Sequence, residues 1–302
     1  MNWKYKAALQ GAFSNIPLGA HLNLYAQKWI QRSLPLDDAH FAHSVSLAKL
    51  HVGFLQEYGG RPLEDASFYE FGAGWELSIP LTFYALGIER QVVVDIRPLV
   101  RADLVNDTIG KLQRWLGEGT FVRRPTKYLP KGSASLPLLK EYYGIDYLAP
   151  CDARRTGLEA ISVDYITSTA TLEHIPPEMI RAILRECHRI LKDDGLMSFR
   201  IDYQDHYAYF DPHVSVYNFL RYSDQAWRFF SPQLHYQNRL RHGDYIRLFL
   251  EADFEIVKEE TVDGDEADLK ILKAMPLAEQ FKSYSLHELA VRASNLLLRK
   301  IG

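Results

Sequence analysis

The sequence predicts an α/β protein built on a seven-stranded, mostly parallel sheet that an antiparallel edge hairpin closes. Short apolar or β-branched segments alternate with helical segments along most of the chain, which is typical of a parallel sheet covered by helices. Two further apolar segments, DFEIVKEETV and LAVRASNLLLRK, come late and are separated by a polar stretch. We expect these two to form the hairpin, with a helix over residues 289–300 as the alternative.

The composition suits a large globular protein. The chain has 302 residues, of which 47% are hydrophobic, and 35 Lys and Arg nearly balance 38 Asp and Glu, which gives a net charge of −3. Without a long basic run, nucleic acid is not an expected partner, and no apolar run approaches the ~20 residues of a membrane span. The N-terminus lacks the apolar centre of a signal peptide, and two distant cysteines indicate neither disulfides nor zinc. We therefore predict a cytoplasmic protein without a metal site, and we leave the oligomeric state open, a homo-oligomer included.

The first 66 residues are predicted to be a helical extension. Asp37 and Asp38 suit a helix cap, and the apolar positions that follow recur at spacings of 4 and 3 residues, at Phe41, Val45, Ala48, Val52 and Leu55. The Gly and Pro residues of EYGGRPLEDA then mark a boundary, and residues 67–302 form the main domain.

The main domain offers five candidate parallel strands and one clear helix. The helix begins at Pro176-Pro177, carries one apolar face and ends by Gly195. The segment 107–144 is predicted to be an insertion, within which residues 123–144 loop out of the fold. The predicted strands are Ser67–Phe71, Gln91–Asp95, Ile145–Ala149, Tyr165–Ser168 and Leu196–Ile201.

The stretch FYEFGAGWELSIP, at the end of the first predicted strand, indicates a ligand site. Gly72 and Gly74 let the backbone turn tightly and approach a ligand, and Asp95 ends the next strand, where a carboxylate can accept both ribose hydroxyls. NAD fits these two features, but the third glycine of its fingerprint is replaced by Leu77. Glu70 would also repel a pyrophosphate, so a cationic or zwitterionic ligand is favoured.

At this point the chain resembles the class I S-adenosylmethionine-dependent methyltransferases, in particular their small-molecule branch, type 11. The matching stretches are YEFGAGWELSIP, VVVDIRP, CDAR and VDYITSTATLEHIPPEMIRAILRECHRILKDDGLMSFRI, with the closing LAVRASNLLLRK. The resemblance implies a Rossmann-like fold and S-adenosylmethionine as the cofactor. It also implies a set of cofactor-binding residues, which comprises Glu70, Gly72, Gly74, Asp95, Asp152, Ala153, Thr169 and Thr171.

Residues 203–250 are predicted to form an aromatic-rich cap that contacts the acceptor. Residues 203–245 hold 12 aromatics and four histidines, which suits a lid or pocket wall, although a cap without acceptor contact is the alternative. His206 follows the fifth predicted strand and has Asp202 and Asp205 nearby, so we predict it as the general base. Asp205 joins it as a candidate catalytic residue. His174 of LEHIP is the next candidate, and a structural role is the alternative for both histidines.

The predicted reaction is O-methylation of a small molecule or of a sugar or glycan hydroxyl. After the fourth predicted strand the chain has STAT, where enzymes that methylate amines of nucleic acids show Asn or Asp followed by Pro-Pro and an aromatic residue. Two alternatives remain open: a nicotinamide-dependent oxidoreductase and a catalytically silent S-adenosylmethionine-binding subunit.

Overall fold

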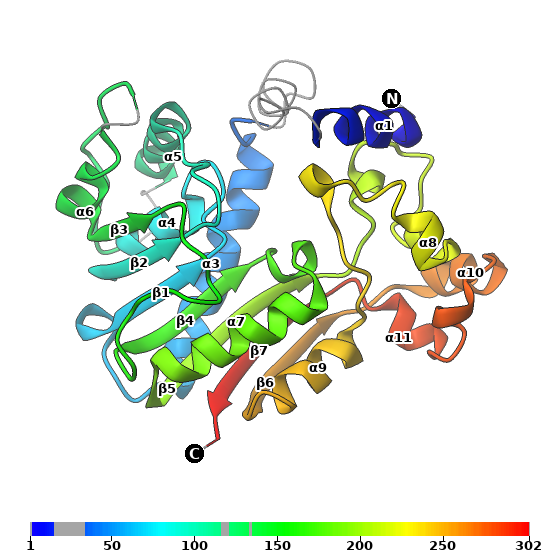
Figure 1. Ribbon diagram of the computed structural model, residues 1–302. Coiled ribbons are helices and arrows are strands. Elements are labelled where there is room, and N and C mark those ends of the chain that lie inside the picture. The colour runs from blue at the N-terminus through cyan, green and yellow to red at the C-terminus, as the bar shows by residue number, and fades with distance from the viewer. Residues whose placement is uncertain (1, 15–33, 116–120, 133–134, 302) are drawn as a thin grey trace.

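The protein is built on one seven-stranded sheet, as predicted (Figure 1). The computed structural model describes residues 2–14, 34–115, 121–132 and 135–301. The strand order is β3-β2-β1-β4-β5-β7-β6, with β1 to β5 parallel and β7 antiparallel to both of its neighbours. The strands are β1 (Ser67–Phe71), β2 (Arg90–Val94), β3 (Ile145–Leu148), β4 (Val163–Thr169), β5 (Leu191–Asp202), β6 (Phe254–Val262) and β7 (Ala293–Lys300).

The antiparallel edge is confirmed, and the alternative of a helix over residues 289–300 is wrong. Leu296, Leu297 and Leu298 are all 0% exposed, because β7 is covered on both faces and successive side chains of a strand point to opposite sides. A surface helix would have left one of three consecutive residues exposed. β6 and β7 pair side by side, but the connection between them carries α10 (Glu266–Ala274) and α11 (Leu286–Ala290).

Helices cover both faces of the sheet. α7 (Pro177–Ile190) and α9 (His242–Leu250) pack on one face, with Tyr69, Phe199 and other strand residues. α3 (Asp38–Tyr58) and α4 (Ser78–Ala85) pack on the opposite face, where Phe68 and Tyr165 point. All five apolar positions that the sequence assigned to the α3 face are buried, and Asp37 caps this helix by accepting a hydrogen bond from the His40 N–H.

Residues 123–144 do not loop out of the fold, so that expectation is wrong. Leu129, Leu139 and Tyr143 are buried in the core between α5 (Ala102–Trp115) and Ile145 of β3. Asn106 of α5 fixes the backbone of Leu129 with two hydrogen bonds, of 2.7 and 2.8 Å. α6 (Leu138–Tyr143) then leads directly into β3. The segment stays packed on the fold because its apolar residues are buried in this core, although most of its other residues are polar.

The aromatic-rich segment after β5 forms a cap with a core of its own. Its short helices are η5 (His206–Tyr209), η6 (Asn218–Arg221), α8 (Asp224–Trp227) and η7 (Gln233–His235). Tyr207, Tyr217, Phe219 and Trp227 pack there with residues from α10 and α11. Together with Tyr222 and Phe230, six of the twelve aromatic side chains of residues 203–245 therefore stabilise the cap itself.

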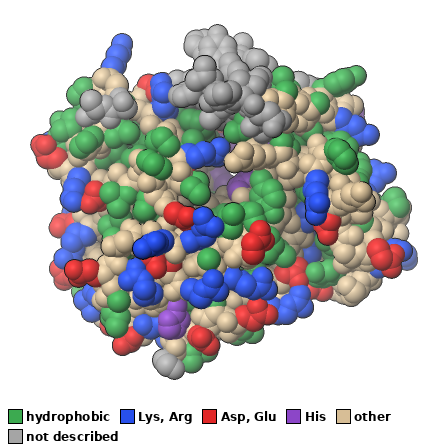
Figure 2. All heavy atoms as spheres, in the orientation of Figure 1, with side chains coloured by type: hydrophobic (Ala, Val, Ile, Leu, Met, Phe, Trp, Pro, Cys, Tyr) green, Lys and Arg blue, Asp and Glu red, His purple; other side chains and the backbone are tan. Residues whose placement is uncertain are grey.

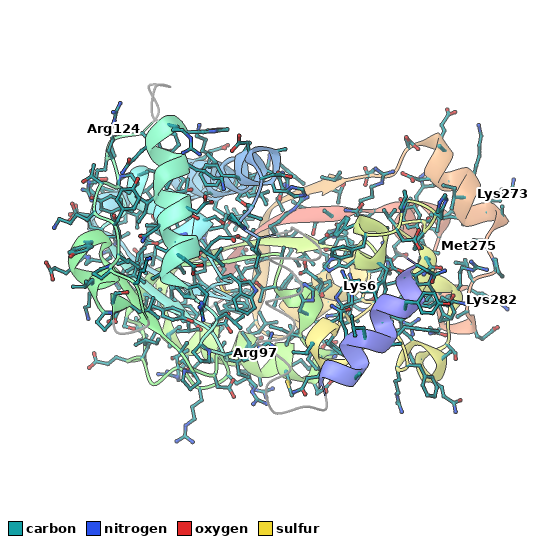
Figure 3. All side chains as sticks on the ribbon, turned by 90° about the horizontal axis from the view of Figure 1, so that it is seen from above. Lys6, Arg97, Arg124, Lys273, Met275 and Lys282 are labelled. Carbon is teal, nitrogen blue, oxygen red and sulfur yellow. The ribbon has the colours of Figure 1, made fainter. Side chains whose placement is uncertain are left out.

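The first helix, α1 (Trp3–Ser14), belongs to this cap rather than to α3 (Figure 1). Trp3 lies in the aromatic core of the cap, with its ring 5.2 Å from that of Tyr207, and its backbone N–H donates to Asp211 at 3.1 Å. Lys6 points inward from α1, whereas Lys273 lies at the outer end of the cap (Figure 3). Within the described parts of the chain, no helix is long and apolar enough to cross a membrane.

Candidate active site

A cavity of about 500 Å³ opens at the carboxyl ends of β1, β2 and β4. The strand order reverses between β1 and β4, and ligands of open α/β sheets bind at such a switch point. Figure 2 shows a hollow in the surface, with histidine side chains visible inside it. Seven of the eight predicted cofactor residues line the cavity, namely Gly72, Gly74, Asp95, Asp152, Ala153, Thr169 and Thr171, and His174 lines it as well.

The two glycines after β1 have different tasks. Both have positive φ, +88° at Gly72 and +68° at Gly74, a conformation that other residues rarely adopt. A Cβ on Gly72 would lie 2.2 Å from Oγ1 of Thr171, so this glycine lets the loop after β4 approach the turn. A Cβ on Gly74 would meet nothing within 4 Å, so the chain leaves open space for a ligand there.

Asp95 follows the last residue of β2 and presents its carboxylate to the cavity. Its Oδ1 accepts a hydrogen bond from the Arg97 N–H at 2.9 Å, which fixes the orientation of the group. Burial is the main cause that raises its pKa, while the backbone N–H groups of Arg97 and Gly74 act in the opposite direction. Hydroxyl donors from a ligand would offset the lost hydration of this carboxylate.

Asp152 also lines the cavity, but Arg154 engages its carboxylate. Nε of Arg154 donates to Oδ1 and Oδ2 at 2.9 and 3.0 Å, and Nη2 donates to Oδ2 at 2.6 Å. These bonds hold the pKa of Asp152 below its usual range. An amino group of a ligand would therefore share this carboxylate with Arg154.

Glu70 lies beneath the cavity and is not one of its lining residues. Its side chain on β1 is 4% exposed, and Oε2 has no hydrogen-bond partner among the described residues. Burial raises the pKa of Glu70 to about 8.

This burial predicts a pH-dependent effect of replacing Glu70 with glutamine. Between about pH 4.5 and 8 the unfolded chain ionises Glu70 while the folded protein keeps it protonated, so wild-type stability falls as the pH rises. The free energy of unfolding of Glu70→Gln relative to wild type should therefore increase with pH, by up to about 1.4 kcal/mol per unit. Denaturant unfolding of the ligand-free protein at several pH values measures it. The control is the exposed residue Glu141: the free energy of unfolding of Glu141→Gln relative to wild type should not rise with pH. If the free energies of unfolding of Glu70→Gln and wild type change with pH in parallel, the prediction is contradicted.

α3 reaches the site through His51, a residue that the sequence analysis did not single out. Its Nε2 lies 3.1 Å from Oγ1 of Thr169, and its Nδ1 lies 2.7 Å from Oγ of Ser198. Desolvation, helped by the charge of Arg200, lowers the pKa of His51 to about 3, so the ring is neutral. These bonds join α3 to the end of β4 and to the middle of β5. No local pattern predicts them, because the partners are far apart in sequence.

Two histidines meet where β4 and β5 end. The ring centroids of His174 and His206 are 4.9 Å apart. Nδ1 of His174 lies 2.8 Å from the carbonyl oxygen of Tyr236, which can only accept, so Nδ1 carries the proton and the other ring nitrogen of the neutral form is an acceptor. Desolvation and the neighbouring His206 lower the pKa of His174 to about 4.

Asp202, rather than Asp205, lies beside His206. Its Oδ2 is 3.3 Å from Nε2 of His206, and it also accepts a hydrogen bond from the Tyr209 hydroxyl. Burial alone would raise the pKa of Asp202, but these contacts and the Gln204 N–H outweigh it and hold the pKa below its usual range.

Asp205 has structural partners. It accepts hydrogen bonds from the Tyr207 N–H and from Nδ2 of Asn218, both at 2.9 Å, and burial raises its pKa to about 6. It therefore anchors the start of the cap. Neither Asp205 nor His206 lines the cavity, so of the three predicted catalytic residues only His174 does.

Comparison with known proteins identifies the domain. Residues 133–199 match a family model described as a methyltransferase domain, and they run from α6 to β5. This stretch of the chain is similar to a methyltransferase domain, which agrees with the predicted resemblance to the class I S-adenosylmethionine-dependent methyltransferases. The seven-stranded sheet confirms the predicted α/β fold. No curated protein matches the chain.

Several solved structures are similar to this chain at low sequence identity. A 1,6-didemethyltoxoflavin-N1-methyltransferase from Burkholderia thailandensis is 13% identical, with a TM-score of 0.48 over 93% of this chain and 86% of its own. A geranyl diphosphate C-methyltransferase from Streptomyces coelicolor is 12% identical, with a TM-score of 0.47 over 89% and 86%. A methyltransferase from Methanosarcina mazei is 12% identical, with a TM-score of 0.45 over 82% and 97%. Likenesses at this level do not identify an acceptor for this chain.

Proposed function

We propose that this methyltransferase binds S-adenosylmethionine in the cavity and methylates a hydroxyl group of a small molecule or glycan. The observation that carries the cofactor part is that the Gly72–Gly74 turn and the Asp95 carboxylate share one cavity. Its volume of about 500 Å³ lies within the range of small-molecule sites.

The residues present fit the cofactor. The open space at Gly74 admits the amino-acid part, and Asp95 offers a desolvated carboxylate to the ribose hydroxyls. Thr169 and Thr171 supply hydroxyl groups at the end of β4, and Asp152 and Ala153 line the remaining wall. S-adenosylmethionine supplies a methyl group that its sulfonium activates toward nucleophiles, so alignment and exclusion of water do most of the catalysis.

A hydroxyl acceptor must lose its proton, and His206 is the proposed base. The Asp202 carboxylate lies 3.3 Å from Nε2 of His206 without a hydrogen bond between them, and its negative charge favours the imidazolium that forms when the ring takes up the proton. Tyr209 stacks on the same imidazole, with ring centroids 5.2 Å apart. His174 is the next candidate for the base, because its ring lies beside that of His206 and borders the cavity. Its second ring nitrogen can accept a proton.

Calorimetric titration of the protein with S-adenosylmethionine and with NADH tests the cofactor. We expect saturable binding of S-adenosylmethionine alone; binding of NADH instead would favour the oxidoreductase. A screen with isotopically labelled S-adenosylmethionine against methyl glycosides, polyols and phenols then tests the reaction. Cofactor binding without transfer to any hydroxyl acceptor would favour the silent subunit, and label on amines or carbon would overturn O-methylation.

A further inference from the structure

Glu173 is a buried acid that the proposed mechanism does not use. It lies in η4 (Leu172–His174), between β4 and α7, and is 1% exposed. Asn238 holds the backbone of this helix, with its N–H 2.8 Å from the Glu173 carbonyl and its Nδ2 2.9 Å from that of Leu172. Neither carboxyl oxygen of Glu173 has a hydrogen-bond partner among the residues that the structure describes.

The surroundings favour the protonated form of Glu173. Burial and then the Asp202 carboxylate raise its pKa well above the usual range. The backbone N–H groups of Glu173 and Asp202, which lie near the carboxyl group without hydrogen-bond geometry, and the Arg200 guanidinium oppose this to a smaller extent. A buried carboxylate without a partner is costly, whereas the neutral acid keeps one O–H donor.

Glu173, His174 and His206 form a Glu-His-His cluster whose spacing admits an oxygen atom. One ligand atom from each residue lies within 4.8 Å of the other two. Three atoms so arranged all lie within about 2.8 Å of a common point, which is the length of a hydrogen bond to oxygen. The cluster can therefore hold an oxygen atom at hydrogen-bond distance from all three residues.

We propose that the Glu-His-His cluster holds the acceptor hydroxyl, with the Glu173 acid donating a hydrogen bond to its oxygen. This inference rests on the proposed function and names the site of its acceptor group. The acceptor oxygen loses its proton to His206 and gains the methyl group, whose bond to sulfur breaks with the electron pair left on sulfur. The Glu173 O–H positions the acceptor oxygen and lowers the pKa of its hydroxyl, so that His206 can remove the proton.

The state and occupant of the cluster can be measured without an acceptor. The infrared difference spectrum between wild type and Glu173→Gln at neutral pH should contain the carbonyl band of a protonated acid; carboxylate bands would overturn the proposal. A crystal structure with S-adenosylhomocysteine should show a water molecule within hydrogen-bond distance of Glu173, His174 and His206. Direct hydrogen bonds among the three side chains, with no water molecule between them, would overturn the proposal. A metal ion bound in the cluster would also overturn it.

Kinetics with an acceptor from the screen separate a donor from a base. Glu173→Gln keeps a donor and should lower kcat by less than about tenfold, whereas Glu173→Met removes it and should lower kcat by about 100-fold. Equal losses in both variants would exclude the donor role. Exposed Glu178→Gln, five residues further along the chain, is the matched control. S-adenosylmethionine affinity should stay unchanged in all three variants. If wild type itself does not bind S-adenosylmethionine, the proposed function fails, and this outcome differs from equal losses of kcat in the two Glu173 variants.

Discussion

Replacing Asp95 with alanine is expected to weaken S-adenosylmethionine binding by two to four orders of magnitude. Its carboxylate lines the cavity with one oxygen already fixed by the Arg97 N–H, and we propose that it accepts both ribose hydroxyls. Each lost charge-assisted hydrogen bond costs roughly 1.5 to 3 kcal/mol, and two such bonds correspond to about 100- to 10,000-fold in Kd. Isothermal titration calorimetry measures this directly.

A matched control separates this effect from a general loss of structure. Asp194→Ala removes an exposed carboxylate at the opposite, amino-terminal end of β5 and should leave cofactor affinity unchanged. Asp95→Asn keeps an acceptor oxygen and should fall between wild type and Asp95→Ala. Unchanged affinity of a folded Asp95→Ala protein would remove Asp95 from the site.

His206→Ala is expected to lower kcat by ~100-fold or more while leaving cofactor affinity nearly unchanged. The base acts on the acceptor proton in the transition state, so its loss affects turnover rather than the binding of S-adenosylmethionine. Single-turnover assays with an acceptor from the screen, together with calorimetry, measure the two quantities.

The matched control for this variant is His287→Ala, an exposed histidine of α11. Asp202→Asn should reproduce part of the His206→Ala defect, because it leaves the imidazole without its charged partner. If cofactor affinity and kcat fall together in His206→Ala, the residue supports the cavity instead, and His174 becomes the candidate base.

The sheet and the cofactor turn could be predicted because each depends on signals within a few neighbouring residues. Consecutive apolar residues such as Leu296 to Leu298 mark a strand that is buried on both faces, and Gly72 and Gly74 mark a turn that needs positive φ. The exact strand ends were harder to predict: β5 begins at Leu191, before the predicted Leu196, although KDDG reads as a turn.

The features that the sequence analysis missed depend on contacts between distant residues. His51 meets Thr169 and Ser198 only because α3 packs across β4 and β5. Glu173 sits in a helix of three residues, too short to show which side is buried. The segment 123–144 looked like a loop because its few apolar residues have no period, yet the core beside β3 receives them.

The two helices α1 and α3 contact different parts of the molecule: α1 docks on the cap, whereas α3 packs beside the cavity. α3 supports the floor of the cofactor cavity through His51, whereas Trp3 helps to build the cap beside His206. Changes in α1 should therefore affect the specificity for the acceptor and its turnover before they affect cofactor binding. If the cap contacts the acceptor as we propose, cleavage near Trp3 is expected to change turnover of the acceptor while S-adenosylmethionine still binds.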